Sequence, residues 1–374
     1  MTLTLAIRNL IHDRVRLVVT LTGVAFAVVL ITTELGLFLG FASTTSALID
    51  HSQADIWIVP KGTRNVDQTP PMSERRRYQA LSTPGVASAE LFVTEFVRWQ
   101  KPDGGVETVL VVGFEPDGTL AGPWNVVAGN IADLKRPSTI FVDELYADKL
   151  AVSALGQIVE MHGKRARVIG LTSGIRSFTQ SPYVFASLKS SRDYALMRSD
   201  QTKHVLVKLV PGADVATAKA DLAARLQGVD VYTKEEFSNR TRVYWMFTTG
   251  AGLALLVASF VGLIVGFVVV AQTLYATTVD HIREFGTLRA IGAGRRYINS
   301  VVIKQALISA AAGYVIGLSL FLFGRYVAGS AAPEIALPWP LALLIAALTV
   351  LMCVGAALVC IRKVMKLDPA MVFK

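Results

Sequence analysis

Residues 242–280, RVYWMFTTGAGLALLVASFVGLIVGFVVVAQTLYATTVD, decide the fold, because no charged residue lies between the Arg at the start and the Asp at the end. A helix that crosses a bilayer needs about 20 apolar residues. Two further stretches, Lys304–Arg325 and Glu334–Arg362, also lack internal charge, and a fourth apolar run contains one acid, Glu34. The sequence predicts a polytopic α-helical membrane protein with transmembrane helices at 17–41, 241–275, 301–326 and 337–361.

The composition agrees with four apolar segments. The chain has 374 residues, of which 52% are hydrophobic and 17% are charged, whereas soluble proteins carry about 25% charged residues. The first segment could be a secretory signal peptide, but its apolar run exceeds the usual h-region of about 7–15 residues. The A-x-A triplet AFA at 25–27, the form of a signal-peptidase cleavage site, lies inside the run and not after it. We therefore expect an uncleaved membrane anchor.

The formal net charge of +9 could indicate a nucleic-acid partner, but its distribution argues against one. Residues 41–240 contain 23 basic and 22 acidic residues, which leaves 14 and 6 of the totals of 37 and 28 for the remainder. That basic excess lies beside the apolar segments, as is typical of cytoplasmic helix ends. We expect the bilayer as partner, with residues 1–16, 276–300 and 362–374 in the cytoplasm and residues 42–240 and 327–336 outside.

Residues 42–240 show the mixed pattern of a large α/β domain. Runs of β-branched and aromatic residues predict strands at Asp55–Val59 and Glu107–Glu115, and residues 157–172 predict a hairpin with Gly163 at its turn. Residues 203–233 are typical of a strand, a turn, an amphipathic helix and a strand, which predicts a compact βαβ unit. No linker composition separates the domain from the next apolar run, so one continuous helix is expected to enter the membrane there.

The two ends of the chain carry weaker signals. In residues 1–16, Leu3, Ile7 and Leu10 recur at helical spacing among basic residues, which is typical of an amphipathic helix on the membrane surface. The alternative is a charged flank without such a role. Cys353 and Cys360 lie in the last apolar run and are expected to be packing residues, because seven residues of helix, about 10 Å, separate them too far for a disulfide.

The sequence lacks the motifs of the common catalytic sites. It contains no G-x-x-x-x-G-K-[ST] phosphate-binding loop and no G-x-S-x-G nucleophile elbow. Its five histidines are scattered without the spacing of metal ligands. We therefore expect no catalytic residue and no metal site on this chain.

Glu34 is a candidate site because an acid within a membrane segment costs about 2.5–3.5 kcal/mol on insertion scales. It could contact a polar or cationic substrate group or line an intramembrane polar site. The structural alternative follows from its position 18 residues after Arg16, about 27 Å along a helix. That is close to the outer boundary of a hydrocarbon core about 30 Å thick. Both interpretations remain open.

A second candidate is the segment REFGTLRAIGAG, residues 283–294, which follows the second predicted membrane helix. It has an apolar and a polar side, as expected of a short helix that docks in a groove of a partner, and its second glycine, Gly292, is suited to end that helix. A helix that rests on lipid is the alternative. The candidate docking residues are Arg283, Glu284, Phe285, Gly286, Leu288, Arg289, Ile291 and Gly292.

The order of one membrane helix, an external α/β domain and three membrane helices, with this segment, resembles the FtsX-like permease family of ABC transporters, which includes the macrolide-exporter (MacB) type. The family has a basic residue and Glu, then Gly, Leu-Arg and Ala-Ile-Gly-Ala, which match residues 283–293. A Leu-Asp-Pro-Ala ending matches Leu367–Ala370. Residues 16–27 and 53–62 look most like the DevC branch. Family members often carry an acid near the start of the third membrane helix, where this chain has Gln305 instead.

The resemblance implies a non-catalytic permease in the bacterial inner membrane that forms a homodimer. It implies that residues 283–292 are a coupling helix received by a separate cytoplasmic ABC ATPase, which would hold ATP and Mg. Mechanotransmission would then drive the external domains to move a lipid-like or hydrophobic substrate outward with a periplasmic membrane-fusion adaptor. A signalling scaffold for a periplasmic hydrolase and a lipoprotein-extracting permease are alternatives within the family.

Overall fold

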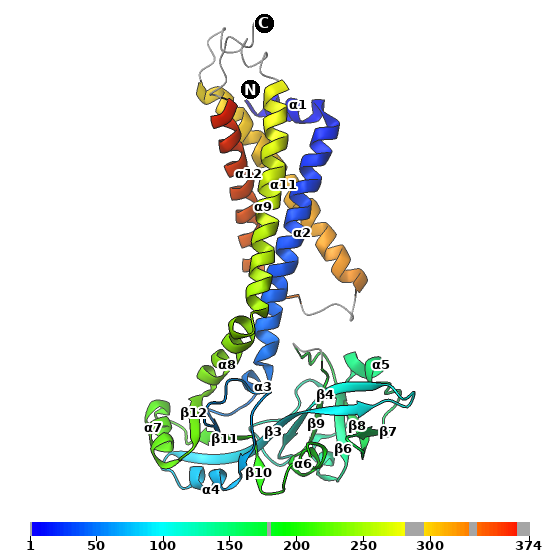
Figure 1. The fold of residues 1–374 in the computed structure, drawn as a ribbon, viewed down its shortest axis with the longest axis vertical. Helices are drawn as coiled ribbons and strands as arrows, with labels where there is room; N and C mark the ends of the chain where they lie inside the picture. The colour runs from blue at the N-terminus through cyan, green and yellow to red at the C-terminus, as the bar shows by residue number, and fades with distance from the viewer. Residues whose placement is uncertain (1, 178–180, 281–294, 329–334, 365–374) are drawn as a thin grey trace. The chain divides into compact units, whose positions relative to one another are not determined.

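The computed structural model describes residues 2–177, 181–280, 295–328 and 335–364. The chain divides into two compact units, a domain from Phe41 to Ala251 and a membrane unit formed by the segments on either side of it. Four helices are long and apolar enough to cross a membrane (Figure 1), and the α/β domain lies between the first and second of them in the sequence. The predicted fold class is confirmed.

The membrane unit contains helices whose lengths follow from their apolar composition. The candidate spans cover Arg14–Thr45, Ala251–Asp280, Asn299–Ala328 and Trp339–Arg362. At one end of the unit, Arg16 on the first long helix forms ion pairs with Asp13 and Asp280. The helices described are α1 (Thr2–His12), α2 (Arg14–Thr45), α9 (Ala251–Asp280), α11 (Arg295–Ala328) and α12 (Trp339–Val364).

Small residues set the helix packing in this unit. A Cβ added at Gly266 of α9 would lie 2.6 Å from Ala27 Cβ, and one added at Gly317 of α11 would lie 2.8 Å from the backbone oxygen of Ala25. Glycine therefore lets α9 and α11 approach α2 closely, as small residues do in membrane bundles. Cys353 and Cys360 are buried and free, as predicted.

The first half of the domain is a split βαβ arrangement. Its strands pair antiparallel in the order β12-β1-β11-β3, and α4 and α7 contribute to the buried cluster on one face of this sheet (Figure 1). The predicted compact βαβ unit is wrong in one respect, because β1 lies between β11 and β12, which do not pair with each other. The elements are β1 (Ile56–Pro60), α4 (Arg75–Leu81), β3 (Val86–Gln100), β11 (His204–Leu209), α7 (Val215–Arg225) and β12 (Val229–Thr233).

The second half of the domain closes on itself. The pairings run β3-β4-β9-β6-β8-β7 and return to β3, so the strands form a closed ring around an apolar core that includes Trp99, Val111 and Val184. The 15-residue strand β3 belongs to both halves. The strands are β4 (Val106–Phe114), β6 (Thr139–Asp143), β7 (Ile158–Met161), β8 (Lys164–Thr172) and β9 (Tyr183–Ser187), with β5 (Val126–Ala128) beside β8.

Short elements complete the domain. Gly163 occupies the turn between β7 and β8 with a φ of 75°, as the predicted hairpin requires. A two-stranded ladder joins β2 to β10. The remaining elements are α3 (Ala47–Asp50), β2 (Met72–Ser73), η1 (Ile131–Lys135), η2 (Glu144–Tyr146), α5 (Ala147–Leu150), α6 (Leu188–Tyr194), β10 (Gln201–Thr202), α8 (Lys234–Val243) and η3 (Tyr244–Thr248).

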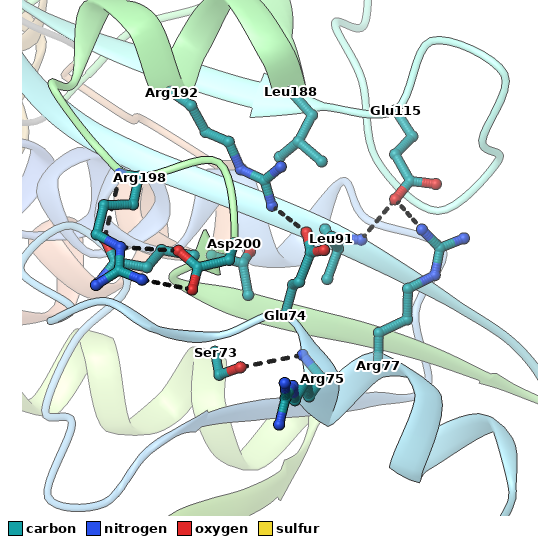
Figure 2. A network of polar contacts seen from close by, with 12 residues as sticks. Ser73, Glu74, Arg75, Arg77, Leu91, Glu115, Leu188, Arg192, Arg198 and Asp200 are labelled. Carbon is teal, nitrogen blue, oxygen red and sulfur yellow. Dashed lines mark hydrogen bonds and ion pairs between the residues drawn. The ribbon is translucent and has the colours of Figure 1, made fainter.

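Ion pairs fix the two halves of the domain to each other, as Figure 2 shows. Glu74, which precedes α4 in the first half, accepts a hydrogen bond from Arg192 of α6 at 2.9 Å. Arg77 of α4 pairs at 2.6 Å with Glu115, which follows β4 and also accepts from the backbone N–H of Leu91. These contacts hold α4 against elements from both halves, so the domain is one body.

The helix that leaves the domain is not continuous with α9. The π-helical turn η3 follows α8, and Gly250 then adopts a φ of 80°, which ends the helical conformation before Ala251. The predicted continuous helix into the membrane is therefore wrong. The cause is local, because only glycine adopts this left-handed conformation without a steric cost.

Candidate functional site

The domain is connected to membrane helices at both of its ends in the sequence, after α2 and before α9. Polar side chains near these two connections are hydrogen-bonded to each other. We call Ser46, Asp50, Ser238 and Arg242 the connection cluster. Ser46 and Asp50 follow α2, and Ser238 and Arg242 belong to α8, which precedes α9 by way of η3. The cluster therefore combines residues that are close in space and 192 positions apart in the chain.

The four side chains of the connection cluster are hydrogen-bonded to one another. Arg242 Nη2 donates to Asp50 Oδ2 at 2.6 Å, and Arg242 Nε donates to Ser46 Oγ at 2.8 Å. Ser46 Oγ donates to Asp50 Oδ2 at 2.6 Å, and Ser238 Oγ donates to Asp50 Oδ1 at 2.7 Å. Charge-assisted hydrogen bonds of this kind are short and directional. The two connections are thus held in one geometry inside the domain.

A second link runs through the loop of residues 61–71, in which Thr63, Asn65, Val66, Asp67 and Thr69 are buried and the other residues are exposed. For its buried side chains we call it the buried loop. Its side chains bond mainly to its own backbone, as Asn65 Oδ1 does in accepting from the N–H groups of Asp67 and Gln68. The loop is also tied to both sheet halves: Thr94 of β3 donates to the carbonyl of Val66 at 2.7 Å, and the ring of His204 on β11 bonds Thr69 at 3.0 Å. A buried loop persists only where such bonds satisfy its polar groups.

The buried loop contacts the helical exit of the domain. Arg240 Nε of α8 donates to the carbonyl of Thr63 at 3.0 Å, and Trp245 Nε1 of η3 donates to Asp67 Oδ2 at 3.1 Å. A π-helical turn is rare and is frequently found at functional sites. Residues 240–245 are therefore attached both to the connection cluster and, through the loop, to strands β3 and β11.

Two titratable side chains in this region are strongly affected by burial. Burial raises the pKa of Asp67 to about 7, while the hydrogen bonds from Trp245 and from its own backbone act in the opposite direction. Burial also lowers the pKa of His204 to about 3, so this ring is neutral at physiological pH. It packs edge-on against Trp57, with ring centres 5.5 Å apart. The core around the loop therefore disfavours charge.

The structure separates the sites predicted from the sequence. The coupling-helix candidates Arg283, Glu284, Phe285, Gly286, Leu288, Arg289, Ile291 and Gly292 lie outside the described residues.

Glu34 lies on α2 and is partly buried, and no hydrogen bond or ion pair joins it to the residues that the structure describes. Two residues further along α2, the carbonyl of Gly36 accepts from the N–H of Ala336, in the segment before α12. Glu34 thus lies close to the level of α2 that this connecting segment reaches. The amphipathic helix predicted in residues 1–16 occurs as α1, with Leu10 buried and Ile7 exposed.

Sequence reasoning missed the connection cluster and the Asp67–Trp245 contact. In the sequence, Arg242 is only the charge that precedes an apolar run, and nothing in its spacing indicates a partner near residue 50. The described residues contain no group of three or more His, Cys, Asp or Glu side chains that could hold a metal ion.

Comparison with known proteins matches both parts of the chain. Residues 17–225 match the family described as MacB-like periplasmic core domain, and residues 256–369 match the family described as FtsX-like permease C-terminal. An uncharacterized ABC transporter permease of Mycobacterium tuberculosis is 23% identical over 380 residues, with 98% of each chain covered. One of Mycobacterium bovis is 24% identical over 387 residues, also with 98% of each chain covered.

Two solved structures that are similar to part of the chain are of external domains. The periplasmic region of MacB from Actinobacillus actinomycetemcomitans is 11% identical with a TM-score of 0.37, over 50% of this chain and 92% of that one. The extracellular domain of the noncanonic ABC-type transporter YknZ from Gram-positive bacteria is 11% identical with a TM-score of 0.36, over 48% of this chain and 98% of that one. On the two family matches, the chain belongs to the MacB/FtsX type of ABC transporter permeases.

Proposed function

We propose that this permease is the transmembrane subunit of an ABC exporter that works as a homodimer with a separate cytoplasmic ATPase. In this proposal ATP and Mg bind to the ATPase, and residues 283–292 receive its movement. The external domains then push a lipid-like or hydrophobic substrate outward, together with a periplasmic adaptor. The basic residues beside the membrane segments support cytoplasmic termini and a place in the bacterial inner membrane.

The connection cluster is the observation that carries the mechanical part of this proposal. Arg242 bonds Ser46 and Asp50, so a force on the segment before α9 reaches the segment after α2 directly. The contact between Trp245 and Asp67 extends the same path to the buried loop and the sheet. A permease that transmits motion needs such a fixed attachment, because slack at the connections would absorb the displacement.

The proposal is tested by purification of the intact complex from membranes, followed by mass spectrometry of the proteins and lipids that copurify. We expect two copies of this chain, two copies of an ABC ATPase and an adaptor protein. ATP should then drive the release of a hydrophobic substrate from the reconstituted complex. A cell-wall hydrolase in place of the adaptor would favour the signalling alternative, and a complex without any ATPase would refute the proposal.

A further inference from the structure

The domain contains a groove that the connection cluster and the buried loop do not explain. Its volume is about 590 Å³, and residues of α7, β12, α8, η3 and the buried loop line it. We call it the basic groove. The side chains that matter for its chemistry are Arg64, Lys219, Tyr232, Asn239, Arg240 and Tyr244.

The charges in the basic groove are not balanced. Lys219 Nζ lies 2.6 Å from both carboxylate oxygens of Glu236, so this pair is neutral as a unit. Arg64 and Arg240 form no ion pair with any residue that the structure describes. The Asp230 carboxylate lies beside the groove, where it accepts from Tyr232 Oη at 3.3 Å, but it pairs with neither guanidinium. Both guanidinium groups can therefore bind phosphate oxygens, which they do through two parallel hydrogen bonds.

Arg240 is held in place before any ligand arrives. Its Nε donates to the carbonyl of Thr63 at 3.0 Å, and its guanidinium carbon lies 5.3 Å from the ring centre of Tyr232. That ring is stacked on the buried Phe237, with centres 5.7 Å apart. Within the described part of the chain no hydrogen bond uses its Nη1 or Nη2, so both remain available to an anion. A side chain that is already ordered loses less entropy on binding.

One end of the basic groove is close, along the covalent chain, to the start of a helix that can cross the membrane. Thr248 lines the groove, and Ala251 begins a helix that can cross the membrane. Three residue steps can span at most about 11 Å. Val243 and Tyr244 line the groove near this end, and tyrosine is enriched at membrane–water interfaces. The groove thus offers two arginines together with an apolar and aromatic wall, a short distance along the chain from a helix that can cross the membrane.

We propose that the basic groove binds the phosphate headgroup of an anionic membrane lipid. Arg64 and Arg240 contact the phosphate oxygens, Asn239 donates a further hydrogen bond, and the glycerol and the first acyl carbons contact Val243 and Tyr244. Inorganic phosphate shares the anionic chemistry but lacks the apolar part. The inference does not depend on the exporter's substrate or on an adaptor, because it concerns a lipid that anchors the domain to the bilayer.

The test uses the full chain in detergent and native mass spectrometry with added phosphatidylglycerol, phosphatidylcholine, glycerol phosphate or inorganic phosphate. Wild type should bind phosphatidylglycerol in preference to phosphatidylcholine. The variants R64A and R64A/R240A should lose that preference, the double variant by about tenfold, as expected for the loss of charged hydrogen bonds. Because Arg64 forms no hydrogen bond within the described residues, R64A tests the site without disturbing the fold.

The matched control is R75A/R225A, which removes two exposed arginines that do not line the groove. It should bind phosphatidylglycerol as wild type does. An unchanged lipid preference in R64A/R240A, with a wild-type melting temperature, would overturn the proposal. Equal binding of inorganic phosphate would overturn the lipid assignment, since it would make the groove a site for soluble anions.

Discussion

Arg242 Nη2 lies 2.6 Å from Asp50 Oδ2 and thereby joins the helix before α9 to the segment after α2. Residues 50 and 242 are near the two ends of the domain in sequence, and each precedes or follows a candidate membrane helix. A single ion pair thus links the first and the last segment of the domain, the two segments that connect it to membrane helices. This arrangement makes the pair a suitable element for transmitting motion, whichever substrate the complex handles.

Removal of the arginine should uncouple the permease more than it destabilises it. In R242A the Asp50 carboxylate keeps its bonds to Ser46 and Ser238, and both partners are about a third or more exposed. We expect a loss of about 1 kcal/mol in unfolding free energy. The transport per ATP hydrolysed in the reconstituted complex should fall severalfold, whereas R225A, at an exposed site, should retain it. Equal coupling ratios for the two variants would contradict the proposed role.

Asp67 should make the stability of the chain depend on pH. Burial raises its pKa from 3.8 to about 7, so the folded chain retains a proton between about pH 4 and 7 that the unfolded chain releases. Stability contributed by this group therefore falls as the pH rises through that window, by at most about 1.4 kcal/mol per pH unit. D67N preserves an acceptor for Trp245 and does not titrate. Its melting temperature should fall less than that of wild type between pH 5 and 7.

The comparison of D67N with wild type isolates one group. His204 has a pKa lowered from 6.5 to about 3, so the stability that its neutral ring contributes is lost as the pH falls below about 6.5. Stability from His204 therefore rises with pH, whereas stability from Asp67 falls. Because both proteins contain His204, its effect cancels in the difference between their melting curves. Parallel pH profiles for the two proteins would show that Asp67 is ionised at neutral pH in the folded chain.

The segment 283–292 should be required for assembly with an ATPase. Replacement of Phe285 or Leu288 by Asp places a charge on its predicted apolar side, which should prevent docking in a hydrophobic groove. We expect the variants F285D and L288D to reach the membrane at normal levels but to copurify with at least tenfold less ATPase. The variant T287D, on the same segment between them, is the control. Normal assembly of F285D and L288D would exclude this segment as the coupling helix.

Glu34 has two interpretations that a neutral isostere distinguishes. If its carboxylate contacts a polar or cationic part of the substrate, E34Q should reduce transport about tenfold or more while the complex still assembles. If it only lies near the outer boundary of the membrane, E34Q should transport normally. The measurement is the initial rate of ATP-dependent substrate release from reconstituted vesicles, with the ATPase rate recorded in parallel. Normal transport by E34Q would show that Glu34 is not a substrate-binding residue.

Two glycines of α11 offer a matched test of helix packing. A Cβ at Gly317 would lie 2.8 Å from the backbone oxygen of Ala25, whereas a Cβ at Gly324 meets no atom within 4 Å. G317A should therefore destabilise the chain by about 1–3 kcal/mol, which is the usual cost of overpacking. G324A should be neutral or stabilising, because alanine favours a helix over glycine. Thermal unfolding in the same detergent compares them, and equal melting temperatures would contradict the observed approach of α11 to α2.

Much of this fold could be predicted because apolar length and alternation are local signals. The four membrane helices followed from apolar runs of sufficient length, three without internal charge and one with Glu34, and the hairpin at Gly163 followed from two strand patterns around a turn. The continuous helix into the membrane was predicted wrongly, because a glycine in an apolar run does not by itself reveal whether it continues a helix or adopts a positive φ. Gly250 adopts a φ of 80°, and the π-helical turn η3 before it makes a hydrogen bond from Trp245 to Asp67.

The sequence by itself determined four membrane helices with an inserted α/β domain, since hydrophobic burial in a bilayer depends on the number of consecutive apolar residues. The permease function followed from the resemblance of residues 283–293 and 367–370 to a known family. Only the tertiary structure decided which residues act together. The two members of each pair lie 176 to 192 positions apart in the chain: Asp50 with Arg242, Asp67 with Trp245, and Arg64 with Arg240. Nothing in a local pattern specifies such pairs, because they form only when the sheet brings distant segments to one place.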